Sequence, residues 1–153
     1  MCGSVSYSRL ACSAVDAFLG ISAEGNRLAS AKIGPAFKRA TALKALRALD
    51  TRVENLMADP RRGIGVEAVI LFGSMTDSTR DPAGDVDFAI ELALVDPRQV
   101  TLDGVFSAYR FLQGRSKCVS IVELGPHRKM VENGPHLALW RGGSRVFDVT
   151  ELG

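Results

Sequence analysis

The stretch LFGSMTDSTRDPAGDVDFAIEL, residues 71–92, decides how this chain folds. It opens on the end of an apolar run that stops at Gly73-Ser74, and it closes on Asp85 and Asp87, which are separated by one valine. The apolar run is short and rich in β-branched residues, which is typical of a buried strand. The intervening DPAG is turn chemistry and can fold the chain back on itself. We therefore expect two strands whose ends bring the glycine and serine opposite the two aspartates.

The residues that follow this turn alternate in polarity. Side chains along a strand point alternately to its two faces, so one face of 85–94 is apolar and the other carries the carboxylates. The two predicted faces are Val86, Phe88, Ile90 and Leu92 on one side, and Asp85, Asp87, Ala89 and Glu91 on the other.

The residue types at the two ends of the loop complement each other chemically. Two carboxylates on one face of a strand can converge on a hard cation such as Mg²⁺, which prefers oxygen ligands. Without a cation, the two like charges repel, and one of them tends to take up a proton. Backbone N–H groups and a hydroxyl at Gly73-Ser74, followed by a short helix, suit an anion such as phosphate. Together these groups predict a site for Mg²⁺-nucleotide chemistry.

This pattern resembles the signature of the minimal nucleotidyltransferases, which is Gly-Ser, ten residues and then Asp-x-Asp before an apolar alternation. These are small relatives of the DNA polymerase β type fold. The resemblance covers about residues 62 to 150, but only 71–92 is specific. It implies that Asp85 and Asp87 are catalytic and bind the metal, and that Gly73 and Ser74 bind the nucleotide. It also implies transfer of a nucleoside monophosphate from a nucleoside triphosphate to a hydroxyl of a protein partner or an RNA. Small stand-alone members often act within toxin–antitoxin pairs.

The sequence departs from this family at one position. Active members add a third carboxylate from a later strand, and KCVSIVEL (117–124) is where we expect it. The residue that matches best is Ser120, which is not an acid. Alternation points Glu123 to the opposite face from Ser120, and Glu91 shares the face of the aspartates but lies further along. The protein is therefore either a nucleotidyltransferase with an altered site or a catalytically impaired fold that binds a nucleotide or a protein.

The remaining patterns complete an α/β (α+β) domain with a small mixed sheet of the nucleotidyltransferase type and flanking helices. Residues 100–113 suit a helix that Gly114 ends, and 125–134 suit a short one. Residues 136–149 predict a hairpin turned by Gly142-Gly143.

The first 60 residues are predicted to be helical, with helices over 8–20, 22–34 and 35–60. We expect them to form an N-terminal segment, 1–61, ahead of a nucleotidyltransferase-like domain, 62–153. The longest helix begins at Pro35 and carries an apolar stripe that fits the core of this chain or, alternatively, a partner helix. The stripe consists of Ala42, Leu46, Leu49, Val53 and Leu56.

Charge is unevenly distributed along the chain. The net charge is +2, but residues 1–62 carry ten Lys/Arg against five Asp/Glu, whereas residues 63–153 carry nine against twelve. A solvated helical face explains the basic half, and an anionic partner is the alternative. Residues 14–34 resemble a helix-turn-helix, although Asp16 and Asn26 fall where small and apolar residues belong. A DNA-binding regulator is therefore a second alternative, and the basic helices, alone or in a homodimer, are candidates to hold a large acceptor.

The spacing of the cysteines and the length of the apolar runs indicate the cellular compartment of the protein. The three cysteines are widely spaced and lack metal-type spacing, so they are read as free thiols in a reducing compartment. No apolar run reaches the length of a membrane span, and the start is a poor signal peptide. We expect a cytoplasmic protein without membrane contact. His127 and His136 have no metal-ligand spacing and are predicted to be loop or surface residues.

Overall fold

The computed structural model describes residues 37–59, 62–81 and 84–153. The helices expected over 8–20 and 22–34, and with them the helix-turn-helix resemblance, lie outside the described residues. Residues 35–153 form one compact unit, and the description below is of this unit.

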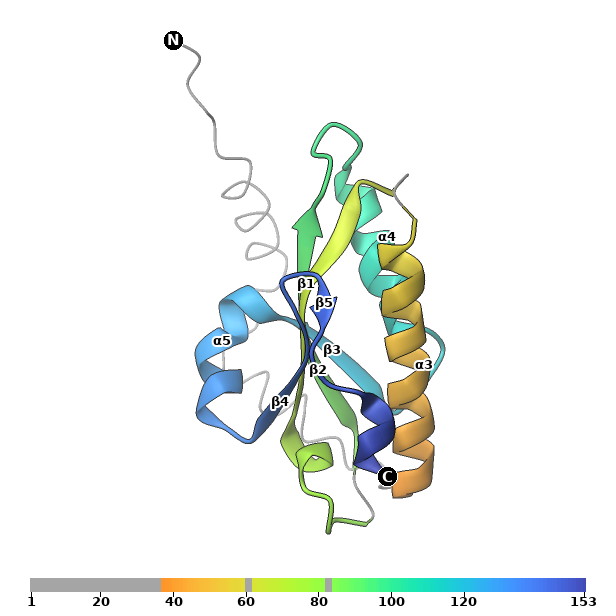
Figure 1. The fold of residues 1–153 in the computed structure, drawn as a ribbon, viewed down its shortest axis with the longest axis vertical. Coiled ribbons are helices and arrows are strands. Elements are labelled where there is room, and N and C mark those ends of the chain that lie inside the picture. The colour runs from red at the N-terminus through yellow and green to blue at the C-terminus, as the bar shows by residue number, and fades with distance from the viewer. Residues whose placement is uncertain (1–36, 60–61, 82–83) are drawn as a thin grey trace. The chain divides into compact units, whose positions relative to one another are not determined.

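A five-stranded mixed sheet forms the centre of the unit, in the order β3-β2-β1-β4-β5 (Figure 1). The central strand β1 pairs antiparallel with β2 and β4, β2 pairs parallel with β3, and β4 pairs antiparallel with β5. The predicted class, a small mixed sheet with flanking helices, is confirmed. The strands are β1 (Ile64–Phe72), β2 (Val86–Leu94), β3 (Val119–Glu123), β4 (His136–Arg141) and β5 (Ser144–Arg145).

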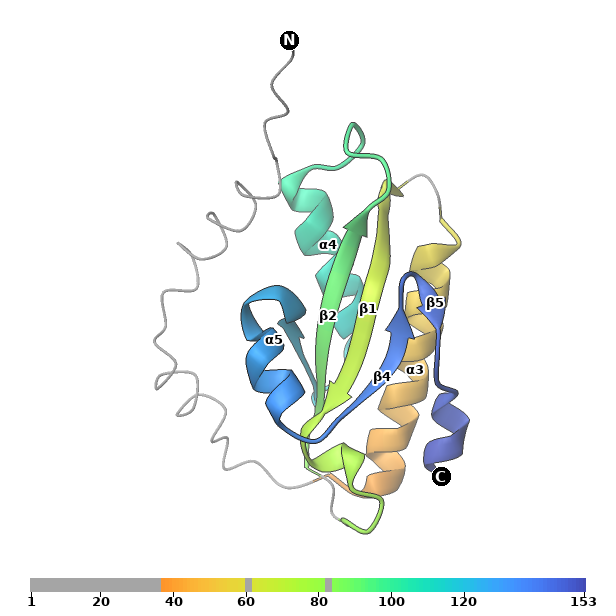
Figure 2. The same ribbon diagram turned by 60° about the vertical axis from the view of Figure 1, so that its left-hand side comes forward.

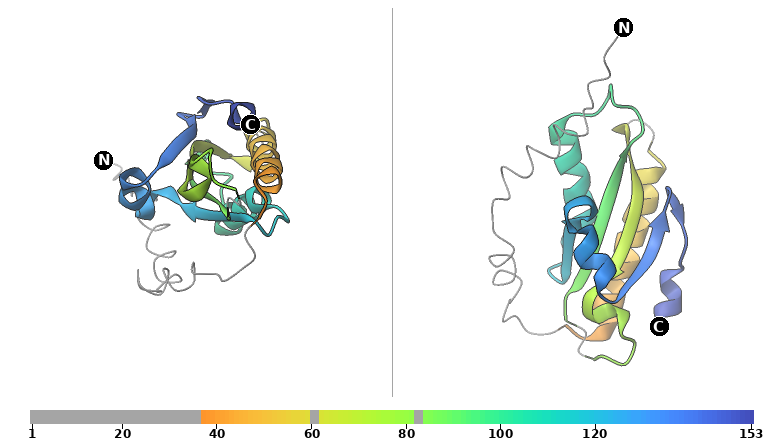
Figure 3. Two further views of the ribbon diagram at one scale, coloured as in Figure 1. Left: turned by 90° about the horizontal axis from the view of Figure 1, so that it is seen from below. Right: turned by 90° about the vertical axis from the view of Figure 1, so that its left-hand side faces the viewer.

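The helices cover the two faces of this sheet unequally. Helices α3 (Arg39–Met57) and α4 (Leu102–Gln113) lie on one face, and α5 (Leu124–Asn133) lies on the other (Figures 2 and 3). A short 3-10 turn, η2 (Gly73–Thr76), follows β1, and a second, η3 (Val149–Leu152), follows β5. The larger core lies under α3 and α4, because the apolar side chains of β2 point there; they are Val86, Phe88 and Ile90.

The apolar stripe of α3 is buried in this core, so the prediction of packing within the chain is confirmed. Its five residues are at most 1% exposed; they are Ala42, Leu46, Leu49, Val53 and Leu56. The helix begins at Arg39 rather than at Pro35, because Lys38 has an extended backbone (ψ 141°). The Arg39 N–H donates to Asp81 Oδ1 at 3.0 Å, so the loop before the aspartate pair caps this helix. The compact unit starts at Pro35, and the boundary expected between residues 61 and 62 therefore falls inside it.

The segments after β2 follow their predicted patterns closely. Thr101 caps α4, since its Oγ1 accepts from the Gly104 N–H at 3.0 Å, and Gly114 ends the helix with φ +63°. The hairpin β4–β5 turns at Gly142-Gly143, as expected. It is fastened to α3 by Asp50, which is 6% exposed and accepts from Trp140 Nε1 at 2.8 Å. Within the described part of the chain, no helix is both long and apolar enough to cross a bilayer.

Candidate metal and nucleotide site

The predicted site residues lie in one row across the sheet. Phe72, the last residue of β1, pairs with Asp87 of β2, and Asp87 pairs with Ser120 of β3. Directly paired residues point to the same face of a sheet. Phe72 packs against the cluster under α5, so this row faces the α5 side. Ser120 is therefore beside Asp87 on the carboxylate face, as alternation predicted.

The loop brings the Gly-Ser pair against the aspartates. A Cβ added to Gly73 would lie 3.0 Å from Asp87 Oδ2, and a Cβ added to Gly84 would lie 3.3 Å from Ser74 Oγ. Both glycines have left-handed backbones, with φ +78° at Gly73 and +76° at Gly84. Asp85 follows Gly84 directly. The structure thus gathers the four predicted residues at one end of the sheet.

The helical segment that begins at Gly73 is shorter than the helix expected after Gly73-Ser74 at the predicted phosphate site. It is one 3-10 turn of four residues, η2, closed by Thr76 Oγ1 donating to the Gly73 carbonyl at 2.7 Å. A single turn sums few peptide dipoles, so a helix macrodipole contributes little here. What the turn offers a phosphate is the absence of a Cβ at Gly73, local backbone N–H groups and the Ser74 hydroxyl.

The electrostatics of Asp87 show the expected repulsion. Burial, followed by the neighbouring charge of Asp85, raises the pKa of Asp87 from 3.8 to about 6. Both causes disfavour the charged carboxylate. A cation between the two aspartates would remove both penalties, because it would replace lost solvation and offset the like charge.

The donor set fits one hard cation. Two carboxylates, Asp85 and Asp87, supply anionic oxygens, and the third position of the row is the neutral hydroxyl of Ser120. Among the described residues, no group of three or more His, Cys, Asp or Glu side chains could hold a metal ion. The residues present therefore suit a single Mg²⁺ that also takes phosphate oxygens and water, since Mg²⁺ is commonly held by one or two carboxylates.

Neither of the nearby glutamates lies beside Asp87 on the carboxylate face. Glu123 pairs with Ile90, whose side chain is in the core on the α3–α4 face. Glu91 shares the face of Asp87 but lies four residues along β2, roughly 13 Å away at strand rise. Its carboxylate is held 2.7 Å from Arg128 of α5. The predictions about both side chains are thus confirmed.

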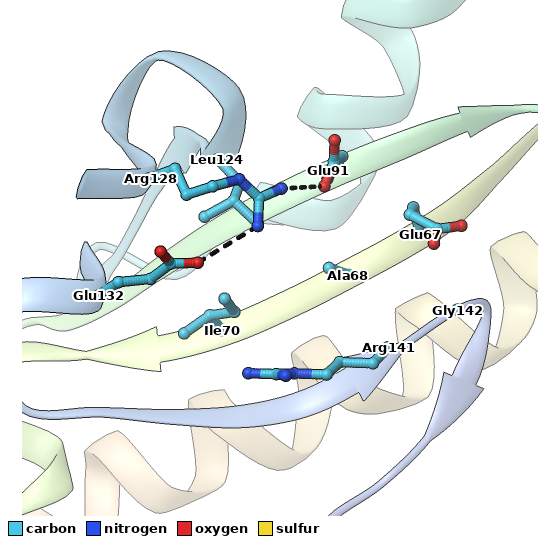
Figure 4. A pocket seen from close by; sticks show the side chains of 9 residues that line it. All are labelled: Glu67, Ala68, Ile70, Glu91, Leu124, Arg128, Glu132, Arg141 and Gly142. Atoms are coloured by element: carbon cyan, nitrogen blue, oxygen red, sulfur yellow. Dashed lines mark hydrogen bonds and ion pairs between the residues drawn. The ribbon is translucent and has the colours of Figure 1, made fainter. Parts of the chain in front are cut away.

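A polar cleft of about 230 Å³ lies on the same sheet face but away from the aspartates (Figure 4). Its charged side chains include the ion pairs of Arg128 with Glu91 and Glu132. Between this cleft and the Asp87 row, Leu124 and Val131 of α5 pack on Ile70 and Ala89. Ile70 is 2% and Ala89 0% exposed, and Ile70 and Leu124 also line the cleft, so this apolar packing forms the wall of the cleft toward the Asp87 row.

One further residue joins the row, and the sequence indicated it only as a loop or surface residue. His136, the first residue of β4, pairs with Phe72 on the side away from Asp87. No local pattern marks it, because its position depends on the pairing of β4 with β1.

Comparison of the chain with models of protein families, with curated proteins and with solved structures finds no match.

We expect Gly73→Ala to disturb both stability and the site. Alanine at φ +78° is strained, at a cost of about 1–2 kcal/mol, and its Cβ would press on Asp87 Oδ2. Urea unfolding and Mg²⁺-nucleotide titration should both show a loss. Gly142→Ala is the matched control, because φ there is +57° but nothing lies within 4 Å of the new Cβ. The control should lose stability and keep binding; full binding by Gly73→Ala would show that the turn does not meet the ligand.

Proposed function

We propose that this chain is a Mg²⁺-dependent protein of the nucleotidyltransferase type, which binds a nucleoside triphosphate and passes its nucleoside monophosphate to a hydroxyl acceptor. The observation that carries the proposal is the close approach of Gly73-Ser74 to Asp85 and Asp87 at one end of the sheet. Groups suited to phosphate and groups suited to Mg²⁺ there share one small region. The resemblance to the minimal nucleotidyltransferases in the same residues supports the same reading.

Each residue has a definite role in this proposal. Asp85 and Asp87 hold Mg²⁺, and Gly73 and Ser74 hold the terminal phosphates. The bound metal would supply charge neutralisation on the phosphates. Catalysis of this kind depends mostly on positioning and on offsetting charge, so a rigid row of strand-borne groups suits it. The acceptor is a partner protein or an RNA in the cytoplasm. The chain and its partner form a pair of the toxin–antitoxin type. A homodimer would enlarge the surface that binds the acceptor.

A second candidate function is favoured by Ser120. Its place beside Asp87 is where the resembled enzymes carry an acid, and a neutral hydroxyl there weakens catalysis more than binding. The chain would then be a nucleotide- or protein-binding module.

The DNA-binding alternative stays a prediction, because residues 14–34, which suggested it, lie outside the described residues. Three arginines of α3 donate hydrogen bonds to backbone oxygens within the chain, which leaves their positive charges in place. Arg39 and Arg47 donate to the backbone carbonyls of Leu152 and Gly153, and Arg52 donates to that of Leu112.

The direct test is incubation with each of the four nucleoside triphosphates and Mg²⁺, with binding and pyrophosphate release measured separately. Mg²⁺-dependent binding with slow release supports a transferase, and binding without release supports the module. The proposal fails if no triphosphate binds in the presence of Mg²⁺.

A further inference from the structure

His136 stands at the open end of the row that contains the aspartates. The pairings run Ser120, Asp87, Phe72, His136 over four neighbouring strands, so all four side chains face the α5 side. Asp87 and His136 are two strand spacings apart, roughly 10 Å between Cα atoms. Only the half-buried ring of Phe72 lies between them in the row.

The turn η2 sits at the same end of the sheet and touches both neighbours of β1. It contacts β2, which carries Asp87, and β4, which starts at His136. Gly73 directly follows Phe72 along the chain. A group bound at Gly73-Ser74 would therefore have β2, with Asp87, on one side and the start of β4, with His136, on the other.

The hydrogen bond of His136 fixes which ring nitrogen meets a ligand. Its Nδ1 lies 2.9 Å from the Gly134 carbonyl oxygen. A carbonyl only accepts, so Nδ1 carries the hydrogen, and Nε2 is left for another partner. The side chain is exposed, so a ligand can reach Nε2, and an imidazolium donates an N–H from that nitrogen.

We infer that His136 Nε2 binds the terminal phosphates of the nucleotide and stabilises the pyrophosphate as it leaves; the inference rests on the proposed function. In the transfer step, the acceptor oxygen forms a bond to the α-phosphorus and loses its proton to solvent. The bond from the α-phosphorus to the bridging oxygen breaks, and its electron pair stays on the pyrophosphate. His136 donates a charge-assisted hydrogen bond to that growing negative charge, and a cation held by Asp85 and Asp87 would add positive charge.

His127 provides a matched comparison within the chain. Its Nδ1 is likewise 2.9 Å from a backbone carbonyl oxygen, that of Glu123. It lies on α5, outside the Asp87 row. The two histidines thus share their local hydrogen bonding and differ in their position relative to Gly73-Ser74.

The test compares the wild type with His136→Ala and His127→Ala by titration with the tightest-binding nucleoside triphosphate, its monophosphate and inorganic pyrophosphate, all with Mg²⁺. Loss of one charge-assisted bond should weaken triphosphate and pyrophosphate binding roughly 10- to 100-fold in His136→Ala and leave monophosphate binding unchanged. His127→Ala should match the wild type. Unfolding curves confirm that both variants are folded.

The possible outcomes distinguish failure of the His136 inference from failure of the proposed function. If the wild type binds the triphosphate and His136→Ala binds it equally well, the inference alone is wrong. An equal loss for monophosphate and triphosphate would also overturn it, because the contact would not be to the terminal phosphates. If the wild type binds no nucleotide, the proposed function and the inference fall together.

Discussion

Replacing Asp85 and Asp87 together by asparagine is expected to abolish Mg²⁺-dependent nucleotide binding and to leave the protein folded. Asparagine keeps the shape of aspartate but removes the anionic oxygens that a hard cation requires. The turn at Gly73-Ser74 stays in place, so loss of binding would report the charge and not the fold. Calorimetric titration with the triphosphate, with and without Mg²⁺, measures the effect.

The same double variant should be more stable than the wild type above pH 6 in the absence of Mg²⁺. The pKa of Asp87 is raised from 3.8 to about 6 by burial and by Asp85, so the folded state holds the proton more tightly than the unfolded state. The charged carboxylate therefore costs stability above pH 6, and this cost disappears as the pH falls below about 4. Because the group is only partly buried, we expect a gain of about 1 kcal/mol at pH 7.5 and none at pH 4.

A charge-matched control is Asp103→Asn with Glu151→Gln, two exposed carboxylates on α4 and η3. It changes the net charge by the same amount and should bind like the wild type. Unchanged affinity in the Asp85/Asp87 variant would count decisively against the assigned roles. A fall in stability at pH 7.5 would contradict the repulsion between the two aspartates.

Ser120→Asp is expected to raise transfer activity, or to create it, against the best available acceptor. Ser120 pairs with Asp87 in the parallel ladder, so the new carboxylate would stand beside the metal-holding pair. A serine hydroxyl is neutral and cannot act as a general base at neutral pH, whereas a carboxylate adds an anionic oxygen for a second cation. General-base contributions are typically about 10²–10⁴-fold, so even a misplaced carboxylate should be detectable. Pyrophosphate release and label transfer measure it.

Ser120→Asn is the control, because it has the size of aspartate without the charge, and it should stay as slow as the wild type. Without Mg²⁺, Ser120→Asp should be less stable than Ser120→Asn, since a third like charge joins the row. Robust wild-type transfer that Ser120→Asp does not increase would show that another group already fills the role.

The sequence predicted those parts of the fold that depend on local patterns. The alternation from Val86 to Leu92 placed the right side chains in the core, and the glycines at 114 and 142–143 marked real ends and turns. The face of Ser120 followed from the period of two along a strand. In each case, neighbours in sequence carry the information.

What the sequence did not predict depends on contacts between distant segments. The N–H at the start of α3 is capped by Asp81, which lies 42 residues away in the chain. The place of His136 beside Phe72 requires the pairing of β4 with β1, and no residue near His136 in the sequence indicates that pairing. The sequence predicted that the apolar stripe of α3 packs within the chain, but it did not predict that α3 belongs to the same compact unit as the sheet, because that depends on core contacts between distant segments.

The measurement that tests the central claim most directly is a crystal structure after soaking with Mg²⁺ and the tightest-binding triphosphate. The account predicts a cation between Asp85 and Asp87, with the terminal phosphates against Gly73 and Ser74. A nucleotide bound elsewhere, for example in the cleft between Arg128 and Arg141, with no cation at the aspartate pair, would contradict it.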